Sequence, residues 1–158
     1  MKTLSKIFGG IATVSAVIVV VLSIAFAAPI LFGFQPRVVL SGSMEPMIPV
    51  GSVVYINQKD TMGEVGKVVA YRIPTVDGET HVIHRIVDRN EKGFITQGDN
   101  NDEPDMIILR PENIIGAYGY HIPFLGYMLA KKMGVLLGIV LWLGGMTGIA
   151  VLLDVASD

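Results

Sequence analysis

Two long apolar runs enclose a middle part in which apolar and polar residues alternate over short stretches. Residues 7–36 and 133–153 contain no charged side chain. Each run is long enough to cross a bilayer, which needs ~20 apolar residues. The pattern predicts an N-terminal transmembrane helix within 1–34 and a C-terminal hydrophobic helix over 133–153 that either spans the bilayer or lies at its interface. A short polar tail, 154–158, follows.

The middle part, residues 35–132, has the pattern of short β-strands. Six runs rich in β-branched residues are separated by clusters of Gly, Pro, Asn and Asp, as turns between antiparallel strands require. We therefore predict a mostly β fold, with a small antiparallel β domain between the two apolar helices. The predicted strands are 37–40, 52–56, 68–73, 81–87, 94–96 and 114–118, and two of the predicted turns are 75–78 and 90–93.

Charge and composition narrow the possible functions of this domain. Residues 35–132 hold 10 of the 12 basic and 12 of the 14 acidic residues, so this part is exposed to water. A net charge of −2 with both signs interspersed offers no surface suited to nucleic acid, which is excluded as a partner. The absence of cysteine rules out thiol catalysis and Cys-based zinc sites.

The N-terminal segment has the features of both a secretory signal and an uncleaved anchor. Lys2 and Lys6 precede the apolar run, and Ala25-Phe26-Ala27 resembles a small-x-small cleavage site. Apolar residues continue past Pro29, however, which exceeds the ~7–15 residues of a signal core and favours the anchor. The positive-inside rule then leaves the N-terminus in the cytoplasm and sends the β domain to the other side of the membrane.

A serine follows the first predicted strand in a segment suited to exposing it. In Ser41-Gly-Ser43-Met-Glu-Pro46, the glycine allows a tight backbone path that presents Ser43 beyond the strand end. Such a segment is ordinarily only a turn. A nucleophilic serine also needs a base.

His84 has the surroundings that a general base requires. Period-two alternation puts it on one face of its strand with Val82 and Ile86, so that it is partly shielded from water and kept neutral. His81 lies on the opposite face and His121 stands near Pro123. We interpret these two histidines as structural.

The third feature is an acidic loop, Gly98-Asp-Asn-Asn-Asp-Glu-Pro-Asp105. An EF-hand calcium site does not fit, because Pro104 occupies the position of its glycine and Arg110 that of its bidentate glutamate. Either the loop is a solvated turn, or one of its carboxylates orients the imidazole of His84 and stabilises the imidazolium.

Together, Ser-Gly-Ser-Met-Glu-Pro, His-Arg and Gly-Asp-Asn-Asn-x-x-x-Asp resemble the motifs of type I signal peptidases. The similarity extends from about Val38 to Tyr120. It is to the branch of archaea, some Gram-positive bacteria and the endoplasmic reticulum, in which a histidine replaces the bacterial lysine base.

This resemblance implies a role for each motif residue. Ser43 matches the nucleophile, His84 the base and Asp105 the acid, while Asp102 stays open as a rival for the acid. Ser41 matches a residue that contributes its hydroxyl to the oxyanion hole. Asp99 matches a supporting residue, which we expect to bond nearby backbone N–H groups.

The resemblance also implies a membrane-bound serine endopeptidase that cleaves signal peptides after small-x-small sequences, with its catalytic domain on the extracytoplasmic or lumenal side. No metal or organic cofactor is implied. Signal peptides and the lipid bilayer are the expected partners, with other membrane subunits or the translocation machinery as further candidates. Two alternatives remain: a catalytically silent membrane subunit, and a serine hydrolase related to self-cleaving repressors.

Overall fold

The computed structural model describes residues 2–75, 78–130 and 132–156. The chain divides into two compact units. Pro29–Tyr127 forms the first, which we call the β unit. Met1–Ala28 and Met128–Asp158 form the second, which we call the helical unit.

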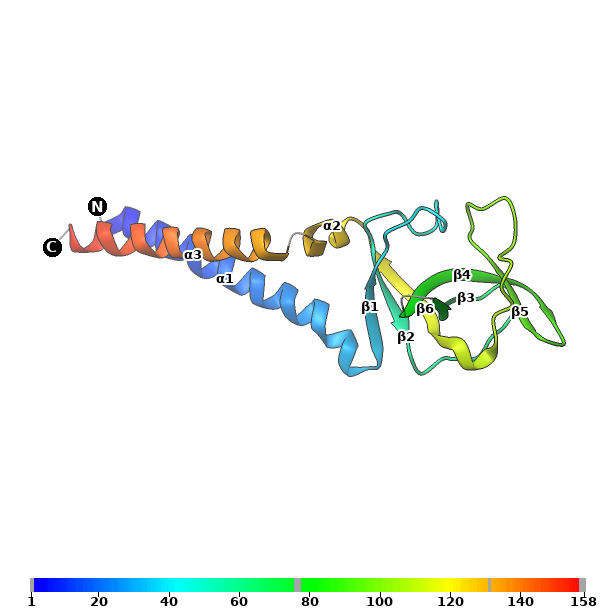
Figure 1. Cartoon of the computed structure of the whole chain (residues 1–158). Helices are drawn as coiled ribbons and strands as arrows, with labels where there is room; N and C mark the ends of the chain where they lie inside the picture. Colours follow the sequence, from blue (N-terminus) through cyan, green and yellow to red (C-terminus); the bar gives the residue numbers. More distant parts are fainter. Residues whose placement is uncertain (1, 76–77, 131, 157–158) are drawn as a thin grey trace. The chain divides into compact units, whose positions relative to one another are not determined.

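Six antiparallel strands form one sheet in the β unit (Figure 1). Their order across the sheet is β1-β2-β6-β3-β4-β5. All six predicted strands are present, and the mostly β fold with an apolar helix at each end is confirmed. The bounds are β1 Phe34–Val38, β2 Val53–Asn57, β3 Val68–Thr75, β4 Gly78–Asn90, β5 Gly93–Gln97 and β6 Ile114–Ile122, with a 3-10 turn, η1, at Pro111–Asn113.

The turn between β4 and β5 forms where the sequence predicts it. The side-chain oxygen of Asn90 accepts the N–H groups of Lys92 and Gly93 at 2.9 and 3.1 Å. The turn predicted over 75–78 joins β3 to β4, and its central residues 76–77 lie outside the described residues.

Strand β3 is buried on both faces. Val68 and Ala70 belong to one apolar cluster, whereas Val69 and Tyr71 belong to another on the opposite face. A strand covered on both sides needs apolar residues in succession, which explains the continuous run Val-Val-Ala-Tyr.

Strand β4 has different neighbours along its length. It pairs with β3 from Gly78 to Arg85, but its pairing with β5 begins only at Arg85. Within the described part of the chain, the segment Thr80–Ile83 therefore has no strand along its second edge.

The direction of the main-chain groups of β4 follows from Ile86. Its N–H donates to the Lys67 carbonyl and its own carbonyl accepts from the Gly66 N–H, so both groups point toward the β3 side. Because these directions alternate along a strand, the main-chain groups of His81 and Ile83 point toward the open edge.

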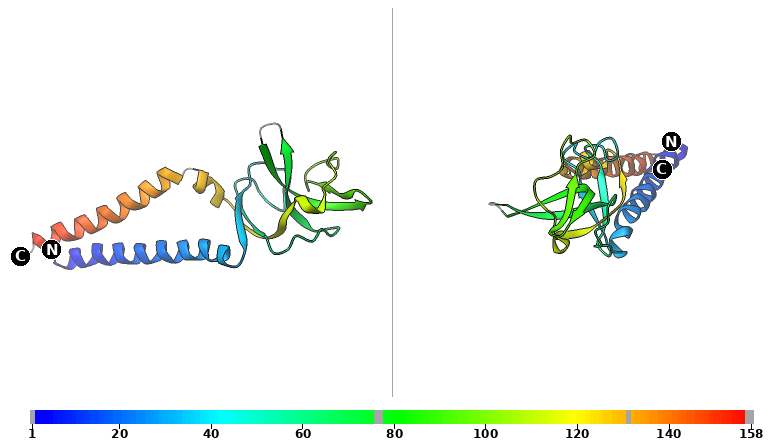
Figure 2. Two further views of the ribbon diagram at one scale, coloured as in Figure 1. Left: turned by 60° about the horizontal axis from the view of Figure 1, so that its bottom comes forward. Right: turned by 90° about the vertical axis from the view of Figure 1, so that its right-hand side faces the viewer.

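The helical unit consists mainly of α1, Lys2–Leu31, and α3, Lys132–Val155, which converge toward the two chain ends (Figures 1 and 2). The Ser5 hydroxyl donates to the Ala150 carbonyl at 2.9 Å, which satisfies one polar group between the helices. Spans of α1 and α3, Thr3–Leu31 and Gly138–Val155, are long and apolar enough to cross a membrane.

Helix α1 ends at Leu31, before the predicted limit at residue 34, because the backbone reverses at Gly33. The N–H groups of Phe32 and Gly33 donate to the carbonyls of Pro29 and Ile30 at 3.0 Å. Gly33 adopts φ +90°, a left-handed conformation that ends helices. The apolar Phe34, which we expected in the helix, consequently opens strand β1.

Two further features near the C-terminus differ from the predictions. A short helix, α2 Leu125–Ala130, lies within the segment expected to be only β-rich. Helix α3 continues to Val155 and so includes Asp154 of the predicted polar tail, while residues 157–158 of that tail lie outside the described residues.

The alternation along β4 predicts a large difference between two neighbouring substitutions. Ile86→Ala should lower the free energy of unfolding by about 2–5 kcal/mol, because Ile86 is fully buried and its removal leaves a cavity. Val87→Ala is the control, because Val87 lies on the opposite face and is 38% exposed. It should lower the free energy of unfolding by less than Ile86→Ala does. Near-UV circular dichroism of the full chain in detergent can measure both, since all five tyrosines lie in the β unit. Equal losses would contradict the assigned faces.

Candidate active site

Ser43 lies in a turn segment that is anchored by buried apolar side chains. The N–H of Glu45 donates to the Gly42 carbonyl, and that of Ile48 donates to the Met44 carbonyl. Met44 and Ile48 are buried in the core, whereas Ser43 is only half-buried. The segment is therefore fixed on one side while the Ser43 hydroxyl stays accessible.

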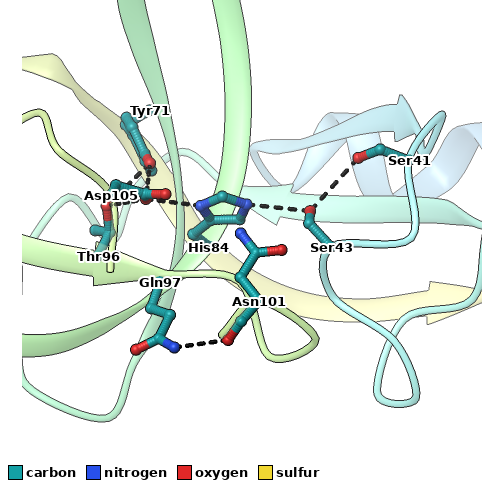
Figure 3. A network of polar contacts seen from close by, with 8 residues as sticks. All are labelled: Ser41, Ser43, Tyr71, His84, Thr96, Gln97, Asn101 and Asp105. Carbon is teal, nitrogen blue, oxygen red and sulfur yellow. Dashed lines mark hydrogen bonds and ion pairs between the residues drawn. The ribbon is translucent and has the colours of Figure 1, made fainter. Parts of the chain in front are cut away.

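The hydroxyl of Ser43 faces a buried histidine on β4. His84 is 8% exposed, and its Nε2 lies 3.1 Å from Ser43 Oγ. Its other ring nitrogen, Nδ1, lies 2.7 Å from Asp105 Oδ2. Ser43, His84 and Asp105, predicted from separate motifs, thus lie in one hydrogen-bonded row (Figure 3).

Asp105 is held after β5 by both its backbone and its side chain. Its N–H donates to the Thr96 carbonyl at 2.7 Å. Besides His84, two hydroxyls donate to the same carboxylate oxygen: Tyr71 at 2.9 Å and Thr96 at 2.6 Å. The two hydroxyls are also only 3.0 Å apart. Because each hydroxyl has a single proton and donates it to the carboxylate, neither donates to the other hydroxyl.

The hydrogen bonds determine the charge state of this group. Burial raises the pKa of the Asp105 carboxyl, but the bonds from His84, Thr96 and Tyr71 outweigh burial and hold the pKa below its ordinary value. Burial raises the pKa of the Tyr71 hydroxyl, which therefore remains a neutral donor. At neutral pH, Asp105 is a carboxylate that accepts a hydrogen bond from the Nδ1–H group of His84.

Tyr71 and Thr96 were not predicted as site residues. In the sequence they stand in strand-like runs and look like ordinary core residues. Their contact with Asp105 depends on strand order and register, which place β3 and β5 on either side of His84.

Ser41 lies close to Ser43 but outside the row. Its exposed hydroxyl is 3.4 Å from Ser43 Oγ, and Figure 3 shows it on the side of Ser43 away from His84. This position lets a group attacked by Ser43 reach both hydroxyls.

Asp99 has a different partner from the one expected. Instead of backbone N–H groups, its two carboxylate oxygens accept the Nε and Nη2 groups of Arg85 at 2.8 and 2.7 Å. The Asp99 bonds raise the pKa of Arg85, so this pair remains charged. The next residue, Asn100, donates its N–H to the Ser43 carbonyl at 2.8 Å. The ion pair thereby fixes the loop that holds Ser43.

The remaining titratable residues of interest are not in the row. Asp102, the rival for the acid, is exposed. The Nδ1 atom of His121 forms a hydrogen bond with the Tyr118 hydroxyl at 2.9 Å. His81 is exposed on β4. Among the described residues, no group of three or more His, Cys, Asp or Glu could hold a metal ion.

A pocket of about 390 Å³ opens beside Ser43 and His84. One wall is the end of β1 with the segment that follows it, and the other is the open edge of β4. Of the remaining lining residues, Met44 and Ile48 are apolar and Asn101 is polar. The lining residues are Val38, Val39, Leu40, Ser41, Ser43, Met44, Ile48, Thr80, His81, Val82, Ile83, His84 and Asn101.

More than half of the chain is similar in sequence to known proteins. Over 102 residues the chain is 36% identical to signal peptidase I W of Bacillus subtilis. The aligned region covers 60% of this chain and 52% of that protein. Over 104 residues, 58% of this chain, it is 35% identical to the signal peptidase complex catalytic subunit SEC11 of Zygosaccharomyces rouxii and 36% identical to that of Neurospora crassa. The chain is thus similar to signal peptidases over 58% to 60% of its length.

The chain spans between 52% and 61% of the length of these relatives. No protein-family model matches it. The relatives include a bacterial enzyme and fungal catalytic subunits, which confirms the resemblance predicted from the three motifs.

Removal of one hydroxyl should change the ionisation of Asp105. Tyr71→Phe should raise the Asp105 pKa and lower the free energy of unfolding at pH 7 by about 1 kcal/mol, because a donor to the carboxylate is lost. This stabilisation belongs to the ionised carboxyl, so it should shrink as the pH falls below about 4.

Carbon-13 NMR titration of the Asp105 carboxyl and urea unfolding would measure the two effects. Tyr118→Phe is the matched control, because the Tyr118 hydroxyl bonds His121 instead. An unchanged Asp105 pKa in Tyr71→Phe would contradict the described network.

Proposed function

We propose that this chain is a membrane-bound serine endopeptidase that removes signal peptides from exported preproteins. The observation that carries the proposal is the hydrogen-bonded row from Ser43 through His84 to Asp105 at the wall of an apolar pocket. Similarity to proteins named signal peptidases supplies the substrate class.

In this mechanism Ser43 is the nucleophile and His84 the general base. His84 Nε2 takes the proton of Ser43 Oγ as the oxygen attacks the scissile carbonyl. Asp105 accepts a hydrogen bond from the Nδ1–H group of His84, which fixes the tautomer and stabilises the imidazolium. His84 then gives its proton to the departing amine, and water releases the acyl-enzyme. These steps need neither a metal nor an organic cofactor.

The negative oxygen that develops on the attacked carbonyl needs hydrogen-bond donors. The Ser41 hydroxyl, close to Ser43 Oγ, and the backbone N–H of Ser43 are the groups we assign to it. Both belong to the same turn segment, so one local fold positions the nucleophile together with its oxyanion donors.

Two strand edges are suited to hold the substrate in an extended form. The first is the open edge of β4 at Thr80–Ile83. The second is the segment after β1. The N–H and carbonyl of Val39 bond Ser52 and Gly51, so the main-chain groups of its neighbours Val38 and Leu40 point to the opposite side. An extended peptide lying in the pocket between them gains main-chain hydrogen bonds, while its side chains alternate into apolar recesses.

The apolar helices explain why such an enzyme is tethered. A signal peptide presents its cleavage site near the membrane surface, so anchoring raises the effective concentration of Ser43 at the scissile bond. Charge bias at the N-terminus favours an extracytoplasmic or lumenal catalytic domain. Because relatives are named subunits of a signal peptidase complex, other membrane subunits or the translocation machinery are the candidate protein partners.

Removal of the nucleophilic oxygen gives the most direct test. Ser43→Ala should reduce preprotein cleavage by a factor of the order of 10⁶, as loss of the nucleophile does in another serine peptidase. Ser41→Ala, which removes one oxyanion donor, should cost about 10²–10³. The assay is cleavage of a preprotein by the full chain in vesicles, with melting temperatures as the folding control. Full activity in Ser43→Ala would exclude Ser43 as the nucleophile, whereas absence of cleavage by the wild type would leave the silent-subunit interpretation.

The three aspartates should separate by both turnover and stability. Asp105→Asn should lower turnover by up to about 10⁴, because an amide cannot offset the imidazolium charge and favours the wrong tautomer. Asp102→Asn should behave like wild type because Asp102 is exposed. Asp99→Asn should be intermediate and less stable, since it breaks the ion pair with Arg85.

Turnover of the three variants should be measured with melting temperatures from the same preparations. If Asp102→Asn alone is inactive yet normally folded, the acid is Asp102 and the assignment of Asp105 is wrong.

A further inference from the structure

Asn101 contributes a polar side chain to the pocket that the mechanism above does not use. It lines the pocket together with Ser43 and His84, and it is exposed. Its hydrogen bonds within the described chain are made by its backbone: the N–H donates to the Gly98 carbonyl at 3.0 Å, and the carbonyl accepts Gln97 Nε2 at 2.7 Å. The side-chain amide has no partner among the described residues and is free to bind a ligand.

The backbone of the loop holds this amide close to the nucleophile. A Cβ atom at Gly98 would lie 3.0 Å from both Asn101 Nδ2 and Ser43 Cβ, so the amide nitrogen is at most twice that distance from Ser43 Cβ. The same Cβ would lie 2.5 Å from the Ser43 carbonyl oxygen, which excludes any residue but glycine without a shift of the backbone. The Asn100 N–H bonds that carbonyl. These contacts fix the backbone of the loop that carries Asn101 relative to Ser43.

Asn101 and Ser41 lie on different sides of the nucleophile. Figure 3 shows the Ser41 hydroxyl beyond Ser43, away from His84, whereas the Asn101 amide lies beside the bond between Ser43 and His84. The oxyanion is assigned to the Ser41 side. The departing nitrogen must lie against His84 Nε2 to receive its proton, which brings the leaving part of the peptide toward Asn101.

We propose that the Asn101 side-chain amide donates a hydrogen bond to a main-chain carbonyl of the leaving segment, just beyond the scissile bond. This inference rests on the proposed function. In acylation the bond from Ser43 Oγ to the carbonyl carbon forms, the carbon–nitrogen bond breaks, and the Ser43 proton passes through His84 to the amine. Asn101 takes no proton in this step. It orients the departing chain so that its nitrogen meets His84.

The test compares two reactions of Ser43 that differ in the leaving group. One is cleavage of a preprotein, and the other is labelling by a fluorophosphonate probe, which has no peptide on the leaving side. Asn101→Ala should lower kcat/KM for the preprotein about threefold to tenfold, the usual effect of one hydrogen bond. Its rate of labelling should stay within twofold of wild type. Asn101→Asp keeps the shape of the side chain but has no amide donor. It should lower kcat/KM for the preprotein at least as much as Asn101→Ala does.

Asp102→Ala is the matched control, because Asp102 is exposed in the same loop and does not line the pocket. It should leave both reactions unchanged. Equal loss of cleavage and labelling in Asn101→Ala, or full cleavage by Asn101→Asp, would overturn the inference. If wild type is not labelled at Ser43 at all, the proposed function itself fails, and the inference fails with it.

Discussion

Asp105 Oδ2 accepts hydrogen bonds from side chains of three adjacent strands: Tyr71 of β3, His84 of β4 and Thr96 of β5. A partly buried carboxylate is costly unless its oxygens are paired, so each of these donors stabilises the charge. The order and register of three strands are therefore coupled to one atom. The same condition keeps the imidazole of His84 in a single orientation.

The other half of the site depends on a contact between two loops. Ser43 sits on the turn after β1, and the loop after β5 bonds its carbonyl through Asn100. Arg85 ties that loop to β4 through Asp99 and also donates to the Gly66 carbonyl. Consequently His84 and its neighbour Arg85 organise the two sides of the site from opposite faces of one strand.

Local alternation of apolar and polar residues was sufficient to predict the strands. The grouping of Ser43, His84 and Asp105 was expected only because three short motifs together resemble those of signal peptidases. These patterns could not predict the partners of Asp105, since Tyr71 lies 34 positions away and meets it only through strand pairing. The Arg85 partner of Asp99 was missed for the same reason. Helix α2 is only six residues long, too short for a reliable helical period.

Under the proposed function, the edge of β4 at Thr80–Ile83, which no described strand pairs, affects which proteins can be cleaved. An edge of this kind recognises main-chain groups, and it can do so only when those groups are not already bonded within another structure. An unfolded polypeptide emerging through a membrane satisfies that condition. In a folded globular protein, most main-chain N–H and C=O groups are already hydrogen-bonded within the protein. Folding of the exported product would itself end its exposure to the protease, without any inhibitor.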